Sequence, residues 1–190
     1  VLDLLSTLVD KSLVVFENQN NPPRYRLLET IRQYAHDRLQ ASGQTDLCRA
    51  RHRDYFLALA EETEAKMGGP EQPQAFNTLE VEHDNLGAAL DWCRVDPRGA
   101  EAGLRLASAL QEFWRLRGYL REGRERLTEA LEHAGETSAA VRANAHWRLG
   151  DLAWAQSDFS TAAQHLQENL ALSRQVGDKR NLANALRSLG

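Results

Sequence analysis

The chain has 190 residues, of which 42% are hydrophobic and 26% charged, and these shares are typical of a folded globular protein. Its formal net charge is −4, from 23 basic and 27 acidic residues, and no region is basic enough to indicate nucleic-acid binding. The two cysteines, Cys48 and Cys93, lie far apart in sequence, so neither a disulfide framework nor a zinc site is expected.

Targeting signals are missing from the sequence. No basic leader precedes an apolar run, and no apolar stretch approaches the roughly 20 residues that a membrane span requires. We therefore expect a cytoplasmic protein that does not contact a membrane. The chain begins at Val1 rather than at a Met and ends at Gly190 inside an apparent helix, which indicates a piece of a longer protein.

Residues 1–45 predict the C-terminal part of a winged-helix domain. Apolar residues recur every three or four positions over residues 1–11, which indicates an amphipathic helix. Two short runs of β-branched and aromatic residues flank an Asn- and Pro-rich turn over residues 13–27, which indicates a β-hairpin. The helical period returns at Leu28 and stops near Gly43, where a glycine can cap the helix.

Residues 46–97 predict a helical linker region. Aromatic and apolar residues share one face of residues 46–67, and Gly and Pro then end the helix. A further helical region is expected from about Gln74 to Val95, and Pro97 marks the boundary with the next region.

Residues 98–190 predict stacked helix pairs, because the sequence repeats itself there. Leu149 and Gly150 recur as Leu189 and Gly190, and the pattern at 159, 162, 166 and 170 echoes that at 120, 123, 127 and 131. Glycines would let helices pack at about 8 to 10 Å between axes. We expect large side chains to fill the space between these helices, namely Trp114, Trp147, Trp154 and Phe159.

This region resembles the tetratricopeptide repeat, with Asn169 where that family usually has alanine. The resemblance predicts a truncated α-solenoid, and thus a mainly α fold for the whole chain. The last helix, from about Asn181, would lack its partner and fray. The residues expected to carry the repeat packing are Trp147, Leu149, Gly150, Ala153, Phe159, Ala162 and Leu166.

Three ordered motifs carry a second resemblance. They are Leu-Leu-Ser-Thr-Leu-Val-Asp-Lys-Ser-Leu at 4–13, Tyr-Arg-Leu-Leu-Glu-Thr-Ile-Arg-Gln-Tyr-Ala at 25–35, and Glu-His-Asp-Asn-Leu at 82–86. Together they resemble the signal-transduction ATPases with numerous domains (STAND proteins), and more narrowly the bacterial predicted ATPases of LuxR-type and antibiotic-regulatory-type transcriptional regulators. That resemblance implies a P-loop ATPase domain before the winged helix and repeats that sense a partner or inducer.

The resemblance also bears on cofactors. The chain has no Gly-rich loop ending in Gly-Lys-Ser or Gly-Lys-Thr, so we expect no cofactor and no enzyme activity in these residues, while ATP or ADP with Mg²⁺ is implied for the full-length protein. Related switches have Met-His-Asp where this chain has Leu27, Leu28 and Glu29. Because leucine cannot donate a hydrogen bond, the winged helix would pack on the ATPase domain without reading nucleotide through that side chain.

Three other sets of residues have both a functional and a structural interpretation. Direct DNA contact is not expected, since residues 1–11 offer Lys11 alone for phosphate contacts. Glu80 and His83 have the spacing of a metal-binding helix motif, but the further ligands that such a site needs are not evident, so a helix junction closed by His83 and Asn85 is favoured. A possible partner-binding cluster, interleaved with glutamates that favour a salt-bridged face, comprises Arg115, Arg117, Arg121 and Arg124.

The sequence therefore favours a non-catalytic regulatory and interaction module, with a protein partner or small effector on its repeats and an ATPase domain as an intramolecular partner. Two alternatives remain open from the sequence. One is the regulatory module of a cyclase- or kinase-linked ATPase, and the other is a plain repeat adaptor.

Overall fold

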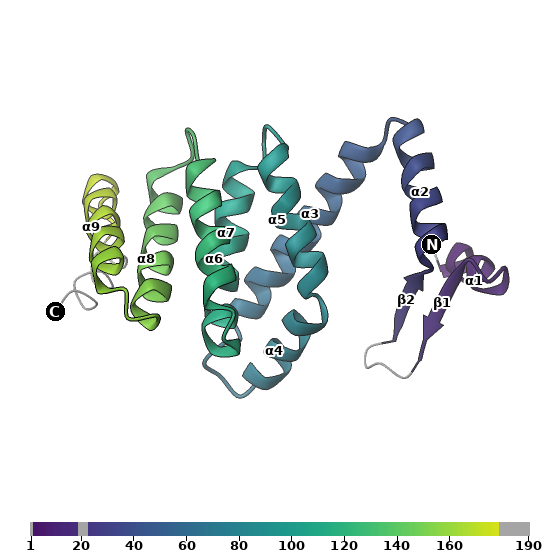
Figure 1. The fold of residues 1–190 in the computed structure, drawn as a ribbon, viewed down its shortest axis with the longest axis horizontal. Coiled ribbons are helices and arrows are strands. Elements are labelled where there is room, and N and C mark those ends of the chain that lie inside the picture. Colours follow the sequence, from purple (N-terminus) through teal and green to yellow (C-terminus); the bar gives the residue numbers. More distant parts are fainter. Residues whose placement is uncertain (1, 19–22, 179–190) are drawn as a thin grey trace. The chain divides into compact units, whose positions relative to one another are not determined.

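The computed structural model describes residues 2–18 and 23–178. These residues form two compact units, which divide between Cys48 and Arg49, and the first matches the predicted winged-helix segment 1–45 closely in extent. The described part is mainly helical with one small hairpin, as predicted (Figure 1). The helix expected from Asn181 and the recurrence at Leu189 and Gly190 lie outside the described residues.

The first unit contains the predicted helix, hairpin and helix in that order. Helix α1 spans Leu2–Asp10, and strands β1 (Val14–Glu17) and β2 (Arg24–Leu27) pair antiparallel, with Val14 opposite Leu27. Helix α2 spans Glu29–Ala41. Among the residues described in this unit, Val14 is the buried apolar side chain, while large apolar side chains such as Leu4 and Tyr34 are exposed.

The second unit is a stack of antiparallel helices. Helix α3 begins in the first unit, and α6, α7, α8 and α9 follow one another side by side (Figure 1). The helices are α3 (Thr45–Glu64), α4 (Gln72–Val81), α5 (His83–Val95), α6 (Ala100–Arg117), α7 (Leu120–Glu132), α8 (Ala139–Ala155) and α9 (Phe159–Val176).

The helical region predicted from Gln74 to Val95 is interrupted at Glu82. The Glu82 backbone leaves the helical conformation, with φ −98° and ψ 8°. The Asn85 side-chain amide donates a 2.6 Å hydrogen bond to the Glu82 carboxylate, which ties the two helices at their junction. The break lets Leu79 in α4 and Leu86 in α5 both be buried. No Gly or Pro marks this position, but the helix junction favoured from the sequence at Glu80 and His83 lies here, between Val81 and His83.

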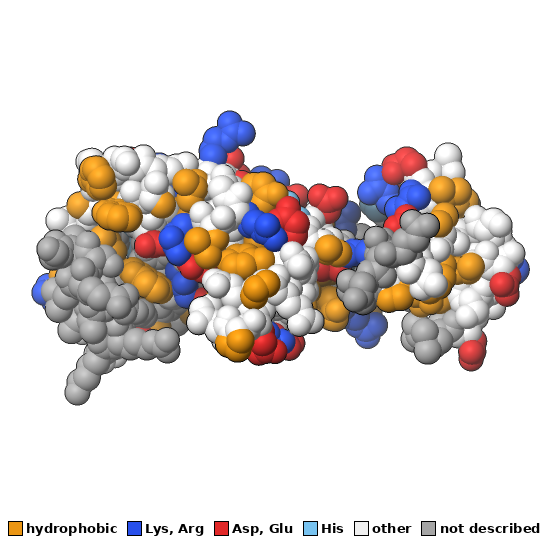
Figure 2. Space-filling model, turned by 90° about the horizontal axis from the view of Figure 1, so that it is seen from below, with side chains coloured by type: hydrophobic (Ala, Val, Ile, Leu, Met, Phe, Trp, Pro, Cys, Tyr) orange, Lys and Arg blue, Asp and Glu red, His pale blue; other side chains and the backbone are white. Residues whose placement is uncertain are grey.

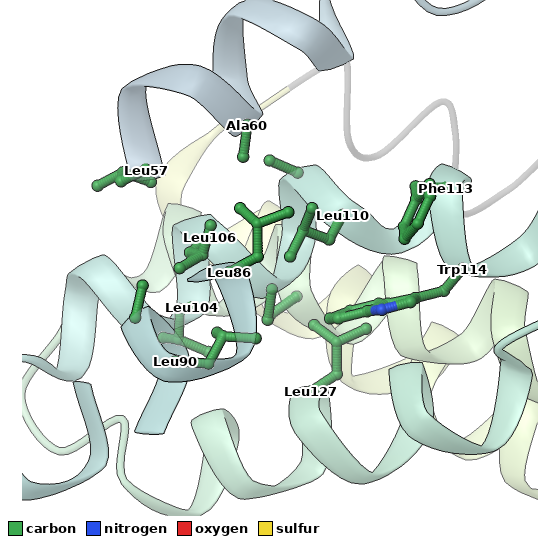
Figure 3. Packing of buried hydrophobic residues seen from close by; sticks show 14 of the residues in the cluster. Leu57, Ala60, Leu86, Leu90, Leu104, Leu106, Leu110, Phe113, Trp114 and Leu127 are labelled. Atoms are coloured by element: carbon green, nitrogen blue, oxygen red, sulfur yellow. The ribbon is translucent and has the colours of Figure 1, made fainter. Parts of the chain in front are cut away.

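The core of the second unit runs without interruption from α3 to α8, and the predicted boundary at residues 97 and 98 lies within it. Figure 3 shows the Trp114 indole lying against Leu127, with Leu110 and Phe113 of the same helix beside it. Helix α6 supplies the largest share of this core because it is apolar on several faces. A helix of that kind is covered by neighbours on more than one side.

Two glycines allow the closest approaches. A Cβ at Gly123 in α7 would lie 2.8 Å from Trp114 Cε3 and 2.9 Å from Leu152 Cδ1. A Cβ at Gly150 in α8 would lie 3.2 Å from Leu166 Cγ. Since carbon atoms pack best at about 3.5 to 4.0 Å, helices α6 to α9 depend on these glycines for their spacing.

Large aromatic side chains occupy different environments. Trp114 is buried and Trp147 half-buried, whereas Trp154 is 61% and Phe159 59% exposed. The two exposed rings pack edge to face, with centroids 6.4 Å apart, at the turn between α8 and α9. They therefore lie at the surface of the described structure rather than between helices.

Candidate interaction groove

A groove lies between the end of α3 and the exposed face of α8. Its volume is about 590 Å³. The same helices that build the core position it, because α3 and α8 both pack beside α6. The residues that line the groove are Glu61, Glu64, Ala65, Met67, Asn144, Trp147, Arg148 and Asp178.

Arg148 organises the wall that α8 contributes. One terminal nitrogen of its guanidinium donates to the Glu64 carboxylate of α3, and the other donates to Gln111 Oε1 of α6 at 3.0 Å. The guanidinium carbon also lies 4.5 Å from the centroid of the Trp147 ring. An arginine fork held in this way joins three helices and orients the indole.

A network of hydrogen-bonded polar side chains continues from Arg148 along α6 and α8. Gln111 is buried, and its amide donates to Asp151 Oδ2 at 2.6 Å. Burial raises the pKa of the Asp151 carboxyl, while Arg115 at 3.7 Å and the Gln111 amide oppose that rise. On the α3 side, Arg105 donates two hydrogen bonds of 2.8 and 2.9 Å to Glu61.

The groove offers fixed donors, fixed acceptors, one aromatic ring and a small apolar patch at Ala65 and Met67. This combination suits noncovalent recognition. In the described ranges, no group of three or more His, Cys, Asp or Glu side chains is placed to hold a metal ion. Likewise, none of the described helices is long and apolar enough to cross a membrane.

Trp147 was predicted from the repeat pattern, but the side chains that surround it were not. Glu64 and Gln111 lie 84 and 37 positions from Arg148, so spacing along the chain carries no sign of their contact. One sequence pattern could have indicated the groove. Polar side chains recur three or four positions apart on α8, at Asn144, Arg148 and Asp151.

The residues predicted to carry repeat packing divide between interior and surface. Leu149, Gly150, Ala153, Ala162 and Leu166 are buried where α8 meets its neighbours. Trp147 lines the groove, and Phe159 is at the surface. Asn169, which departs from the repeat pattern, is buried and donates a 2.6 Å hydrogen bond to the Ala143 carbonyl.

Each arginine of the predicted cluster has its own carboxylate partner. Arg115 pairs with Glu112 at 2.7 Å, and Arg117 with Glu80 at 3.3 Å. This arrangement favours ion pairs within and between helices over a shared anion site. The other two are Arg121, which is 90% exposed and lies 3.8 Å from Glu125, and Arg124, which lies 2.8 Å from Asp158.

The remaining sequence candidates lie apart from the groove lining. The Glu80 carboxylate accepts a 2.7 Å hydrogen bond from the Tyr119 hydroxyl, while His83 Nε2 lies 3.1 Å from Glu122. Burial raises the pKa of the Cys93 thiol to about 11, which keeps it protonated. In the first unit, Leu28 is the N-terminal cap residue of α2 and is partly exposed.

Figure 2 shows acidic and basic side chains interleaved over the helical unit rather than gathered by sign. Fold and groove together define a helical scaffold with a polar groove.

No family model and no solved structure matches this chain. Over its whole length the chain is 41% identical in sequence to "Putative HTH-type transcriptional regulator Rv0890c" of Mycobacterium tuberculosis. It has the same identity to "Putative HTH-type transcriptional regulator Mb0914c" of Mycobacterium bovis. An uncharacterized protein of M. bovis is 40% identical over 36% of the chain and 17% of its own length. The chain spans 22% of the length of the two regulators.

Proposed function

We propose that this chain is the non-catalytic regulatory and protein-interaction portion of a STAND-type ATPase transcriptional regulator. The observation that carries the proposal is the 41% identity over the whole chain to proteins named as helix-turn-helix transcriptional regulators. The ordered motifs at 4–13, 25–35 and 82–86 support the narrower assignment to the STAND class.

The groove between α3 and α8 supports an interaction role for the helical unit. Its volume of about 590 Å³ falls in the range of roughly 300 to 1,000 Å³ that ligand pockets occupy. Stacked helices present such surfaces to peptides and effectors because each unit contacts only its neighbours. In this proposal, a protein partner or small effector binds beside Trp147 and Arg148.

The first unit fits a docking role in the same proposal. Several of its large apolar side chains, among them Leu4, Phe16 and Tyr34, are exposed. A surface of this kind is suited to an intramolecular partner, for which the STAND resemblance supplies the ATPase domain. ATP or ADP with Mg²⁺ would be held by that domain, outside these 190 residues.

The test is nucleotide binding by the full-length protein, with and without the whole helical unit that contains the repeats, residues 49–190. If the repeats gate a switch ATPase, the Kd for ADP or ATP changes when they are deleted. If neither form binds nucleotide, the STAND assignment is wrong and the plain adaptor becomes the better description.

A further inference from the structure

A pair of histidines faces across the packed interface of α8 and α9. His146 Nδ1 and His165 Nδ1 lie 3.0 Å apart, and the ring centroids are 5.3 Å apart with the planes tilted by 31°. Both rings are half-buried, so solvent reaches them from one side. As neutral rings they share one hydrogen bond, in which the protonated Nδ1 of one donates to the bare Nδ1 of the other.

We propose that His146 and His165 form a two-histidine site for a divalent transition metal ion, which clamps α8 to α9. The site lies apart from the groove and adds a ligand that the proposed regulatory role does not require. Imidazole nitrogens suit Zn²⁺, Ni²⁺ and Cu²⁺. Water molecules complete the coordination, because no group of three His, Cys, Asp or Glu ligands occurs within the described residues.

The distance between the two nitrogens fits adjacent positions on such an ion. With metal–nitrogen bonds of about 2.0 to 2.1 Å, two ligands at a right angle lie about 2.9 Å apart, and two tetrahedral ligands about 3.3 Å apart. The observed 3.0 Å lies between these values. Binding therefore needs a tautomer shift, in which the shared proton leaves Nδ1 and a proton is taken up on Nε2 of the same ring, and little movement of either helix.

The charged groups near the pair are of both signs. Arg142 acts on His146 and Arg124 acts on His165, and both oppose a bound cation, whereas Glu168 and Asp158 near His165 favour one.

Contacts on both sides of the pair fix α8 against α9 and so fix the positions of the two rings. On one side of the pair, Asn169 of α9 is bonded to the Ala143 carbonyl of α8. On the other side, Gly150 of α8 is in close contact with Leu166 and Ala162 of α9. Because both ends are fixed, the histidines are presented on rigid helices, which lowers the cost of ordering them around an ion.

The experiment is a titration of the untagged, metal-free 190-residue chain with Zn²⁺, Ni²⁺ and Cu²⁺ at pH 7.5, followed by calorimetry and by thermal unfolding. We expect one equivalent to bind and to raise Tm. His146→Gln and His165→Gln should each weaken binding by tenfold or more. The control His133→Gln removes an exposed histidine at the end of α7 and should bind like the parent chain.

The paramagnetic resonance spectrum of the bound Cu²⁺ gives a readout that does not depend on variants. Two equatorial nitrogens in the parent chain support the site. The proposal is overturned if none of the three ions binds, if the bound ion has fewer than two nitrogen ligands, or if binding survives either glutamine variant. It is equally overturned if His133→Gln abolishes binding.

Discussion

Single residues set the spacing of the helices in the second unit. At Gly123, the Trp114 indole and the Leu152 side chain occupy the space that any larger residue would need. Since Trp114 and Leu152 are themselves buried in the core, they cannot move away without disturbing α6 and α8. A Cβ at Gly87, by contrast, would meet only the far end of the Arg126 side chain, at 3.9 Å.

We therefore expect Gly123→Ala to lower the free energy of unfolding by about 1 to 3 kcal/mol, the usual cost of overpacking a core. The matched control is Gly87→Ala, also inside a helix. Alanine there is expected to be neutral or to stabilise by about 0.5 to 1 kcal/mol, because it only reduces the flexibility of the unfolded chain. Urea unfolding of the two variants measures both effects, and equal stabilities would show that the approach at Gly123 is not tight.

At the scale of elements, α8 and α9 are joined through an interface that contains ionisable groups. His146 and His165 face each other, with Arg142 and Arg124 acting on them as further positive charges and with Glu168 and Asp158 near His165. The pKa of His146 is about 4 in the folded chain and that of His165 is also lowered, whereas both are about 6.5 when unfolded.

This difference predicts loss of stability in mild acid. Because the folded pKa lies below the unfolded one, the unfolded chain binds more protons as pH falls below about 6.5. The stability that the neutral pair contributes is thus present above that pH and is lost progressively towards about pH 4. We expect a loss of about 1 kcal/mol between pH 7 and pH 5, measured by urea unfolding without metal, after allowance for solvent screening of the half-exposed rings.

His146→Gln tests the cause of this loss. The variant should show a flatter dependence of stability on pH over the same window, because one of the two shifted groups is gone. An unchanged slope would assign the acid sensitivity to other residues, such as the carboxylates of the interhelical ion pairs.

At the scale of the whole molecule, the two units differ in how much apolar surface they bury. Val14 is the buried apolar side chain among the described residues 2–18 and 23–48, whereas α3 to α8 share a continuous core that includes Leu104, Leu110 and Trp114. Buried apolar contacts make local opening of the structure rarer, and this slows the exchange of backbone amide hydrogens with solvent.

We accordingly predict that backbone amides of β1, β2 and α2 exchange with deuterium about tenfold or more faster than those of α6 in the isolated 190-residue chain. Hydrogen exchange with mass spectrometry measures this directly. Comparable protection in both units would mean that residues 1–48 are stabilised by contacts other than apolar burial. Slower exchange of the first unit in the full-length protein would fit the docking surface proposed for it.

Much of the fold could be predicted because helix period, hairpin composition and capping glycines are local properties. The predicted hairpin, the long α3 and the helix pairs after residue 100 all rest on spacing within a dozen residues. A helix junction at Glu80 and His83 was favoured from the sequence, but its packing role could not be predicted in this way, since it depends on how Leu79 and Leu86 reach a common core.

Of the candidate sites, the sequence by itself determined the residue types and the faces of the helices on which they lie. It placed Trp147 and the arginines on helices, but only the tertiary structure decided their partners. The physical reason is distance along the chain: Arg148 meets a carboxylate 84 positions away and His146 a ring 19 positions away. Packing of the helices alone brings those groups together, and it also decides that Trp114 is buried while Trp154 is exposed.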